Sequence, residues 1–140
     1  MNRRDDTSTG LPASVAPLTT GGIDLVTAAG VDHVRLVYDY LDNGDLDSCA
    51  SLLHDGVVLE LPGAPVVQGR TAVPHAHLGS GPPGARHEID RIVAQGRSVV
   101  ATGSRIATGT GGEEVRFVDL FTIADDGLLL TCTRYFHVAP

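Results

Sequence analysis

The sequence predicts an α+β domain in which helices come first and an antiparallel sheet follows. Apolar residues recur at helical spacing before residue 55, whereas they alternate with polar residues from residue 86 onward. Glycine-rich turn sequences separate the alternating segments, as in a meander of antiparallel strands. An antiparallel sheet has to bury one apolar face, so we expect this sheet to curl around the first helix.

The first helix is marked by apolar residues three and four positions apart, namely Val34, Val37, Tyr38 and Leu41. Asn43-Gly44 follows as a good C-terminal stop signal. A helix begun at Ile23 is expected to break at Gly30, because glycine destabilises a helix interior, and Asp32 could cap a restart.

Two shorter helices and a strand are predicted next. Asp45 can cap a short helix that precedes a turn at 54–56, and a strand at 57–61 then ends at a Pro-Gly pair. A third helix is predicted over 71–78, where Pro74 is tolerated because it falls in the first turn.

Four further strands complete the pattern, at 86–94, 98–108, 115–123 and 128–138. Val118 and Leu120 give the third of these a second apolar face. A sheet that is apolar on both faces suggests that the second face packs against another subunit, so we expect a homodimer.

The segment 115–123 also carries one carboxylate in an apolar row. Side chains alternate along a strand, so one face holds Val115, Phe117, Asp119, Phe121 and Ile123. Removing a carboxylate from water is costly, and Asp119 is therefore expected to have a partner or a task.

The partner follows from the hairpin that Asp126-Gly127 predicts as a two-residue loop. Counting back from that loop places Asp119 opposite Arg134, with Phe121 opposite Cys132 and Phe117 opposite Phe136. Two interpretations remain open. The pair is either a structural ion pair that fixes the strand register, or a charged site at the bottom of an apolar pocket.

Composition excludes several classes of function. The chain has 140 residues, a net charge of −7 and a pI near 5.1, which argues against nucleic acid or anionic membranes as partners. No segment is apolar enough to span a bilayer, and the N-terminus lacks the apolar core of a signal peptide, so a cytoplasmic location is expected. All ten basic residues are arginine, which excludes lysine Schiff-base chemistry. Residues 1–22 are interpreted as a flexible tail and 23–140 as a single domain.

Several short segments, taken in order, resemble the SnoaL-like branch of the nuclear transport factor 2-like superfamily. They are YLDNGDLD at 40–47, VVLELPG at 57–63, GRTAV at 69–73, FVDLF at 117–121 ahead of Asp126-Gly127, and YFH at 135–137. The resemblance implies a cone-shaped α+β barrel with a deep apolar cavity, usually dimeric. Members of this superfamily include polyketide cyclases, ketosteroid isomerases, scytalone-type dehydratases and limonene-type epoxide hydrolases, and others bind ligands without catalysis.

The resemblance also implies roles for particular residues. Asp119 falls where the isomerases hold a protonated Asp and where the cyclases hold a catalytic Asp. His87 falls where the dehydratases keep a catalytic His, and Asp42 lies near another acid of that family. Cys132, Arg134 and Phe136 fall at pocket-lining positions of the isomerases.

The chain departs from each named activity. The general base of the isomerases would fall at Leu61, and their tyrosine at Val37, next to Tyr38. The second dehydratase histidine would fall at Gly109, and the arginine of the epoxide hydrolases at Phe117. No named activity is therefore complete.

The hypothesis from sequence is acid–base catalysis on a small, largely apolar, carbonyl-containing polyketide-like intermediate, through cyclisation, dehydration or isomerisation. The catalytic candidates are Asp119, His87 and Arg134. The substrate-binding candidates are Tyr38, Leu61, Phe117, Phe121, Cys132 and Phe136. No cofactor is implied. The alternative is a non-catalytic binding or dimerisation module. A metal site is not expected, because His75 and His77 point apart on a helix.

Overall fold

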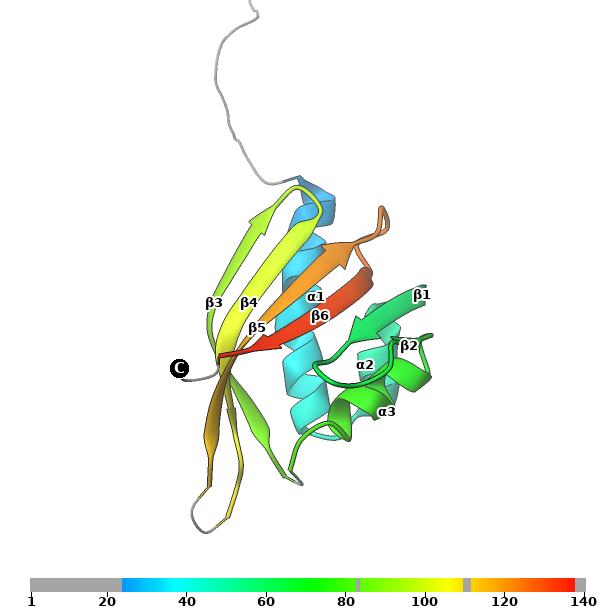
Figure 1. Ribbon diagram of the computed structural model, residues 1–140. Coiled ribbons are helices and arrows are strands. Elements are labelled where there is room, and N and C mark those ends of the chain that lie inside the picture. The colour runs from blue at the N-terminus through cyan, green and yellow to red at the C-terminus, as the bar shows by residue number, and fades with distance from the viewer. Residues whose placement is uncertain (1–23, 83, 110–111, 138–140) are drawn as a thin grey trace, which may run out of the picture.

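The computed structural model describes residues 24–82, 84–109 and 112–137, and within these ranges it is a helix-and-sheet domain (Figure 1). The helices are α1 (Leu25–Asp42), α2 (Leu46–Ser51) and α3 (Ala72–Leu78). The strands are β1 (Leu53–Glu60), β2 (Val67–Gln68), β3 (Arg86–Gln95), β4 (Ser98–Ile106), β5 (Glu114–Ile123) and β6 (Leu129–Phe136). The predicted α+β class is confirmed. The predicted tail, residues 1–22, lies outside the described residues.

The strands form one six-stranded sheet in the order β2-β1-β6-β5-β4-β3. Every pairing is antiparallel except that of β1 with β6, which is parallel. Figure 1 shows the sheet curving past α1, with α2 and α3 gathered near β1 and β2. The curved sheet fits the expected cone, but it is not closed into a barrel, because β2 and β3 are edge strands.

α1 begins at Leu25 and continues through Gly30, so the expected break there is wrong. Asp24 caps the helix by accepting a hydrogen bond from the Thr27 backbone N–H at 2.8 Å. Gly30 is buried against Ile123 of β5, and a Cβ at this position would clash with that side chain. The glycine is therefore a point of close helix–sheet packing, and this contact outweighs its low helix propensity.

The expected turn at 54–56 is also wrong, because these residues lie inside β1. The pairing of β1 with β6 shifts register between Leu53 and Val58, and the Gly56 N–H donates to His54 Nδ1 at 3.0 Å. The turn-forming residues thus make a bulge within a continuing strand. The two-residue β2 was not predicted, since it is too short to show alternation.

The β5–β6 hairpin has the predicted pairing but a different loop. Asp119 pairs with Arg134, and both flanking pairs, Phe117 with Phe136 and Phe121 with Cys132, are as expected. The loop is nevertheless three residues long, since the Ala124 N–H donates to the Leu128 carbonyl and Gly127 adopts φ 84°. Leu130 has no partner on β5, and this bulge restores the predicted register at the site.

The core lies between α1 and the inner face of the sheet, where Val34, Leu41, Leu59, Phe117, Phe121 and Leu129 are almost fully buried. The outer face of β5 and β6 carries partly exposed apolar side chains, namely Val118, Leu120 and Tyr135. The second apolar face expected from the sequence is therefore present, although a partner subunit on it is still a prediction.

Candidate functional site

The predicted contact between Asp119 and Arg134 is a buried, two-pronged ion pair. Arg134 donates from Nε to Oδ1 and from Nη2 to Oδ2 of Asp119, both at 2.8 Å. Arg134 is 2 % exposed and Asp119 is 0 % exposed. Burial opposes the charge on Arg134, but the hydrogen bonds and the charge of Asp119 outweigh that effect and raise the pKa of Arg134.

Tyr38 of α1 supplies a third donor to the same carboxylate. Its hydroxyl donates to Asp119 Oδ2 at 2.6 Å, so the buried hydroxyl has its partner within the protein. Burial, followed by the adjacent charge of Asp119, raises the pKa of Tyr38 well above its usual value. The tyrosine therefore remains a neutral donor at physiological pH.

Aromatic rings enclose the ion pair. The guanidinium carbon of Arg134 lies 4.2 Å from the centre of the Phe117 ring and 5.9 Å from that of Phe136. None of the four pockets found among the described residues is lined by Asp119, whereas Arg134 lines a cavity at the C-terminal end of α1. Arg134 thus separates Asp119 from that cavity.

A second carboxylate–base contact lies at the end of α1. Asp42, the last residue of α1, accepts from His87 Nδ1 at 2.6 Å through Oδ1 and from the His87 backbone N–H at 2.8 Å through Oδ2. The carboxylate can only accept, so Nδ1 carries a proton, and in the neutral form of the ring Nε2 holds the lone pair. His87 Nε2 is buried and has no hydrogen-bond partner among the described residues. Asp42 therefore fixes the orientation of the His87 ring.

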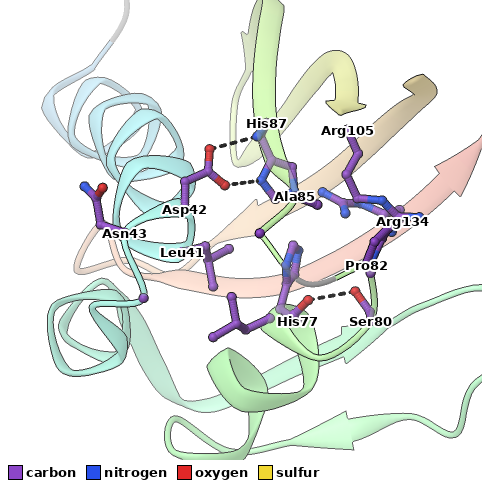
Figure 2. Close-up of a pocket in the computed structure, with 14 residues that line it drawn as sticks. Leu41, Asp42, Asn43, His77, Ser80, Pro82, Ala85, His87, Arg105 and Arg134 are labelled. Atoms are coloured by element: carbon purple, nitrogen blue, oxygen red, sulfur yellow. Dashed lines mark hydrogen bonds and ion pairs between the residues drawn. The ribbon is translucent and has the colours of Figure 1, made fainter. Parts of the chain in front are cut away.

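His87 and Arg134 line one cavity of about 360 Å³, which is within the size range of small-molecule sites. Figure 2 shows Asp42 and His87 on one side of this cavity, Arg105 and Arg134 on the other, and His77 between them. The loop between α3 and β3 contributes small and apolar residues, including Ser80, Gly81, Pro82 and Ala85.

His77 is a cavity residue that the sequence analysis did not assign. Its ring is buried, it lies 5.8 Å from the ring of His87, and Nδ1 has no partner in the described part of the chain. Burial, then the charge of Arg134, lowers the pKa of His77 to about 3, so the ring is neutral. The sequence signal for burial of His77 is its position four residues after Val73, which places both side chains on the same face of α3. His75 is exposed, as the predicted divergence of the two histidines requires.

Ligand atoms of His77, Asp119 and Cys132 all lie within 4.8 Å of one another, yet these donors do not suit a cation. Both oxygens of Asp119 are already bound to Arg134, whose positive charge would repel a metal. Burial, then the charge of Asp119, raises the pKa of the Cys132 thiol well above its usual value, which disfavours the thiolate that a metal needs.

The sequence pattern of the SnoaL-like domain matches residues 34–130, which is most of the chain. The chain belongs to the SnoaL-like domain family. No curated protein matches the sequence significantly.

Solved structures share the fold of this SnoaL-like domain. A candidate ketosteroid isomerase from Kribbella flavida DSM 17836 is 23% identical, with a TM-score of 0.69 over 81% of this chain and 82% of that one. A candidate SnoaL-like polyketide cyclase from Jannaschia sp. CCS1 is 17% identical, with a TM-score of 0.68 over 82% and 90%. An LEH-like epoxide hydrolase from M. tuberculosis is 24% identical, with a TM-score of 0.67 over 79% and 84%.

The SnoaL-like domain brings only some of the predicted site residues together. Tyr38 and Phe117 pack on the His87 ring, with centroids 5.2 and 5.6 Å away. Phe121 and Cys132 line a separate apolar space of about 20 Å³, which is the size of about one water molecule.

The two remaining substrate-binding candidates lie elsewhere. Leu61 is half-buried just beyond β1, where it packs against the core, and it lines none of the four pockets. Phe136 lies beneath Arg105, with the guanidinium carbon 4.9 Å from the ring centre. The substrate-binding assignments stay predictions.

Proposed function

We propose that this SnoaL-like domain catalyses proton transfer on a small carbonyl-containing substrate, with His87 as the acid–base group. The observation that carries the proposal is the unpartnered Nε2 of His87, on a ring whose Nδ1 is fixed by Asp42 at 2.6 Å. An oriented imidazole with an unpartnered nitrogen, on a residue that lines a cavity, is the usual structure of a general base.

In the proposed reaction, His87 Nε2 removes a proton from the carbon next to the substrate carbonyl. The electron pair of the broken C–H bond forms a C=C bond, and the carbonyl π electrons move to oxygen as an enolate. Asp42 stabilises the imidazolium that forms, and the guanidinium of Arg134 stabilises the enolate oxygen. Return of the proton from His87 to another carbon gives isomerisation. Transfer of that proton to a leaving hydroxyl gives dehydration with loss of water. Attack of the enolate carbon on a second carbonyl gives cyclisation, and the alkoxide that forms takes the proton from His87.

Asp119 has a positioning role in this proposal rather than the proton-transfer role expected from sequence. Its two oxygens receive three hydrogen bonds, from Arg134 and Tyr38, and no cavity described above reaches it. A carboxylate that already accepts three hydrogen bonds is a poor base. It can instead hold the guanidinium of Arg134 in one orientation, so that Arg134 can contact a substrate in the cavity.

The family supports the substrate class. Similar folds occur in a candidate isomerase, a candidate polyketide cyclase and an epoxide hydrolase. We infer a polyketide-like biosynthetic intermediate as substrate, and the proposed steps use no cofactor. A cytoplasmic location and a homodimer joined through the outer face of β5 and β6 are part of the same proposal. None of the described helices has the length and apolarity to cross a lipid bilayer.

The second candidate function is a binding module without catalysis. It is favoured by the enclosure of Asp119, because a saturated, buried ion pair is also what a purely structural role would require.

Deuterium exchange separates the two functions without knowledge of the true substrate. The probe is α-tetralone, a small apolar ketone, in D₂O near neutral pD, with exchange of the protons next to the carbonyl followed by NMR. The wild-type protein is expected to accelerate exchange over buffer, and His87→Gln to lose about 100-fold or more of that acceleration. The exposed His75→Gln is the matched control and keeps it.

Either of two results would favour the module. The wild-type protein could give no acceleration over buffer, or His87→Gln could exchange the ketone as fast as the wild type does.

A further inference from the structure

Arg105 is a cavity residue that the proposed reaction does not use. It lies on β4 directly opposite His87 of β3, so its side chain projects from the same face of the sheet beside the histidine. It lines the same cavity as His87 and Arg134 (Figure 2). Nothing in the sequence distinguishes it, because a lone arginine on a strand is usually a solvated surface residue.

The charge of Arg105 has no counter-ion within the described residues. Its Nη1 is shielded from water and has no hydrogen-bond partner there. No carboxylate of the described residues forms an ion pair with it, although the charge of Glu113 acts on it from farther away. Contact with the Phe136 ring at 4.9 Å offsets part of the desolvation, but an aromatic ring offers no oxygen to the N–H groups.

The described residues of the loop over Arg105 do not provide an acceptor for Nη1 either. Gly81 of this loop lies close to Arg105, since a Cβ there would be 3.2 Å from Nη1, and a side chain at position 81 would require the guanidinium to move by a few tenths of an ångström. Burial, followed by the nearby charge of Arg134, lowers the pKa of Arg105, yet a guanidinium remains charged in proteins. Arg105 as a whole is only partly buried, but its shielded Nη1 lacks an acceptor, and an anion that enters the cavity can supply one.

Arg105 and Arg134 converge on the same place. Their guanidinium carbons lie 4.9 and 5.9 Å from the centre of one ring, that of Phe136. Arg134 uses Nε and Nη2 to hold Asp119, so the pair leaves Nη1 of Arg134 unused. The acid on the opposite wall, Asp42, is already occupied by His87. The charge of the Arg105 side of the cavity is therefore positive.

We propose that this side of the cavity is a carboxylate-binding subsite, in which Arg105 holds an anionic carboxylate of the substrate beside the carbonyl group on which His87 acts. The inference rests on the proposed function and narrows its substrate class, from small apolar carbonyl compounds to small carbonyl compounds that also carry a carboxylate. The planar fork of a guanidinium suits the two oxygens of a carboxylate. Arg105 is thus a specificity residue.

The test compares two rigid probes that differ only in charge, 2-naphthoate and 2-naphthamide, at pH 7.5 by titration calorimetry. The wild-type protein is expected to bind the carboxylate about tenfold or more tightly than the amide, because hydrogen bonds between charged groups are the stronger kind. Arg105→Gln loses this preference. Arg86→Gln, which removes an exposed arginine next to His87 that pairs with Glu88 outside the cavity, keeps it.

A stability measurement accompanies the binding data. Arg105→Met removes an unpaired cation and keeps the apolar stem, so its melting temperature is expected to equal or exceed that of the wild type. 2-Naphthoate should raise the melting temperature of the wild type and of Arg86→Gln, but not that of Arg105→Met.

The subsite is refuted if the wild type shows no preference for the carboxylate, including the case in which neither probe binds at about 10 mM. It is equally refuted if Arg105→Gln retains the preference. His87→Gln separates this inference from the proposed function. Retained naphthoate binding in His87→Gln, together with unchanged tetralone exchange, leaves the subsite intact and rejects the catalytic role. Lost preference in Arg105→Gln with normal exchange supports both.

Discussion

The Asp119–Arg134 pair permits a quantitative prediction about stability. Both residues are almost fully buried, and two hydrogen bonds of 2.8 Å join them. Arg134→Met leaves a buried carboxylate with only Tyr38 as donor, and Asp119→Leu leaves a buried guanidinium without an acid. Each change is expected to lower the free energy of unfolding by about 3–5 kcal/mol.

The double variant Asp119→Leu/Arg134→Met should cost far less than the sum of the two. It replaces an ion pair by apolar groups, which is often nearly neutral, and leaves only the Tyr38 hydroxyl unsatisfied, at about 1–3 kcal/mol. The two single changes sum to roughly 6–10 kcal/mol, so the coupling energy should be at least about 3 kcal/mol.

Urea denaturation followed by circular dichroism is the assay, since the chain contains no tryptophan. Asp90 and Arg116 give the matched control, because their ion pair of 2.6 Å spans exposed side chains, and breaking it should cost about 1 kcal/mol or less. If the single changes at Asp119 and Arg134 add to the value of the double variant within about 0.5 kcal/mol, the pair is not the coupled unit described above.

Two other predictions concern the cavity and the outer face. His77 is neutral in the fold, with a pKa of about 3, but gains a proton below its ordinary value when unfolded, so its contribution to stability is complete above pH 6.5 and is lost as pH falls toward 3. His77→Gln should therefore remove up to about 1.4 kcal/mol per pH unit from the acid slope in urea titrations, whereas a slope equal to that of the wild type would contradict a buried neutral ring. Leu120→Glu places a charge on the outer face of β5, where Leu120 is 37% exposed. If that face joins two subunits, light scattering should show the variant as a monomer and the wild type as a dimer, and a monomeric wild type would reject the homodimer.

The parts of the fold that the sequence predicted are those governed by local rules. Alternation along β5 and a glycine turn predicted Asp119 opposite Arg134, and this pairing is observed because the extra loop residue and the unpaired Leu130 compensate for each other. Asp45 capped its helix as expected, because a cap is satisfied within three residues.

The parts that could not be predicted depend on which elements meet in space. A glycine such as Gly30 within a helical pattern predicts a break. Only the close packing of Ile123 against Gly30 shows why a glycine is needed there and the helix continues. The contact between Asp42 and His87 joins positions 45 residues apart, so spacing could not reveal it. The shielded, unpartnered Nη1 of Arg105 depends on the loop around Gly81, which lies far from Arg105 in sequence and packs against it in the fold.

The β5–β6 hairpin has a consequence for sequence variation in relatives of this chain. Its loop is one residue longer than the shortest alternative, and Leu130 is an extra residue on one strand. Each of these two residues shifts the pairing of β5 with β6 by one position, and the two shifts cancel. Deleting one residue from the loop alone, or Leu130 alone, would turn Arg134 away from Asp119, whereas deleting both would restore the contact. In relatives of this chain, a residue lost from the β5–β6 loop should therefore be accompanied by loss of the bulge residue in β6.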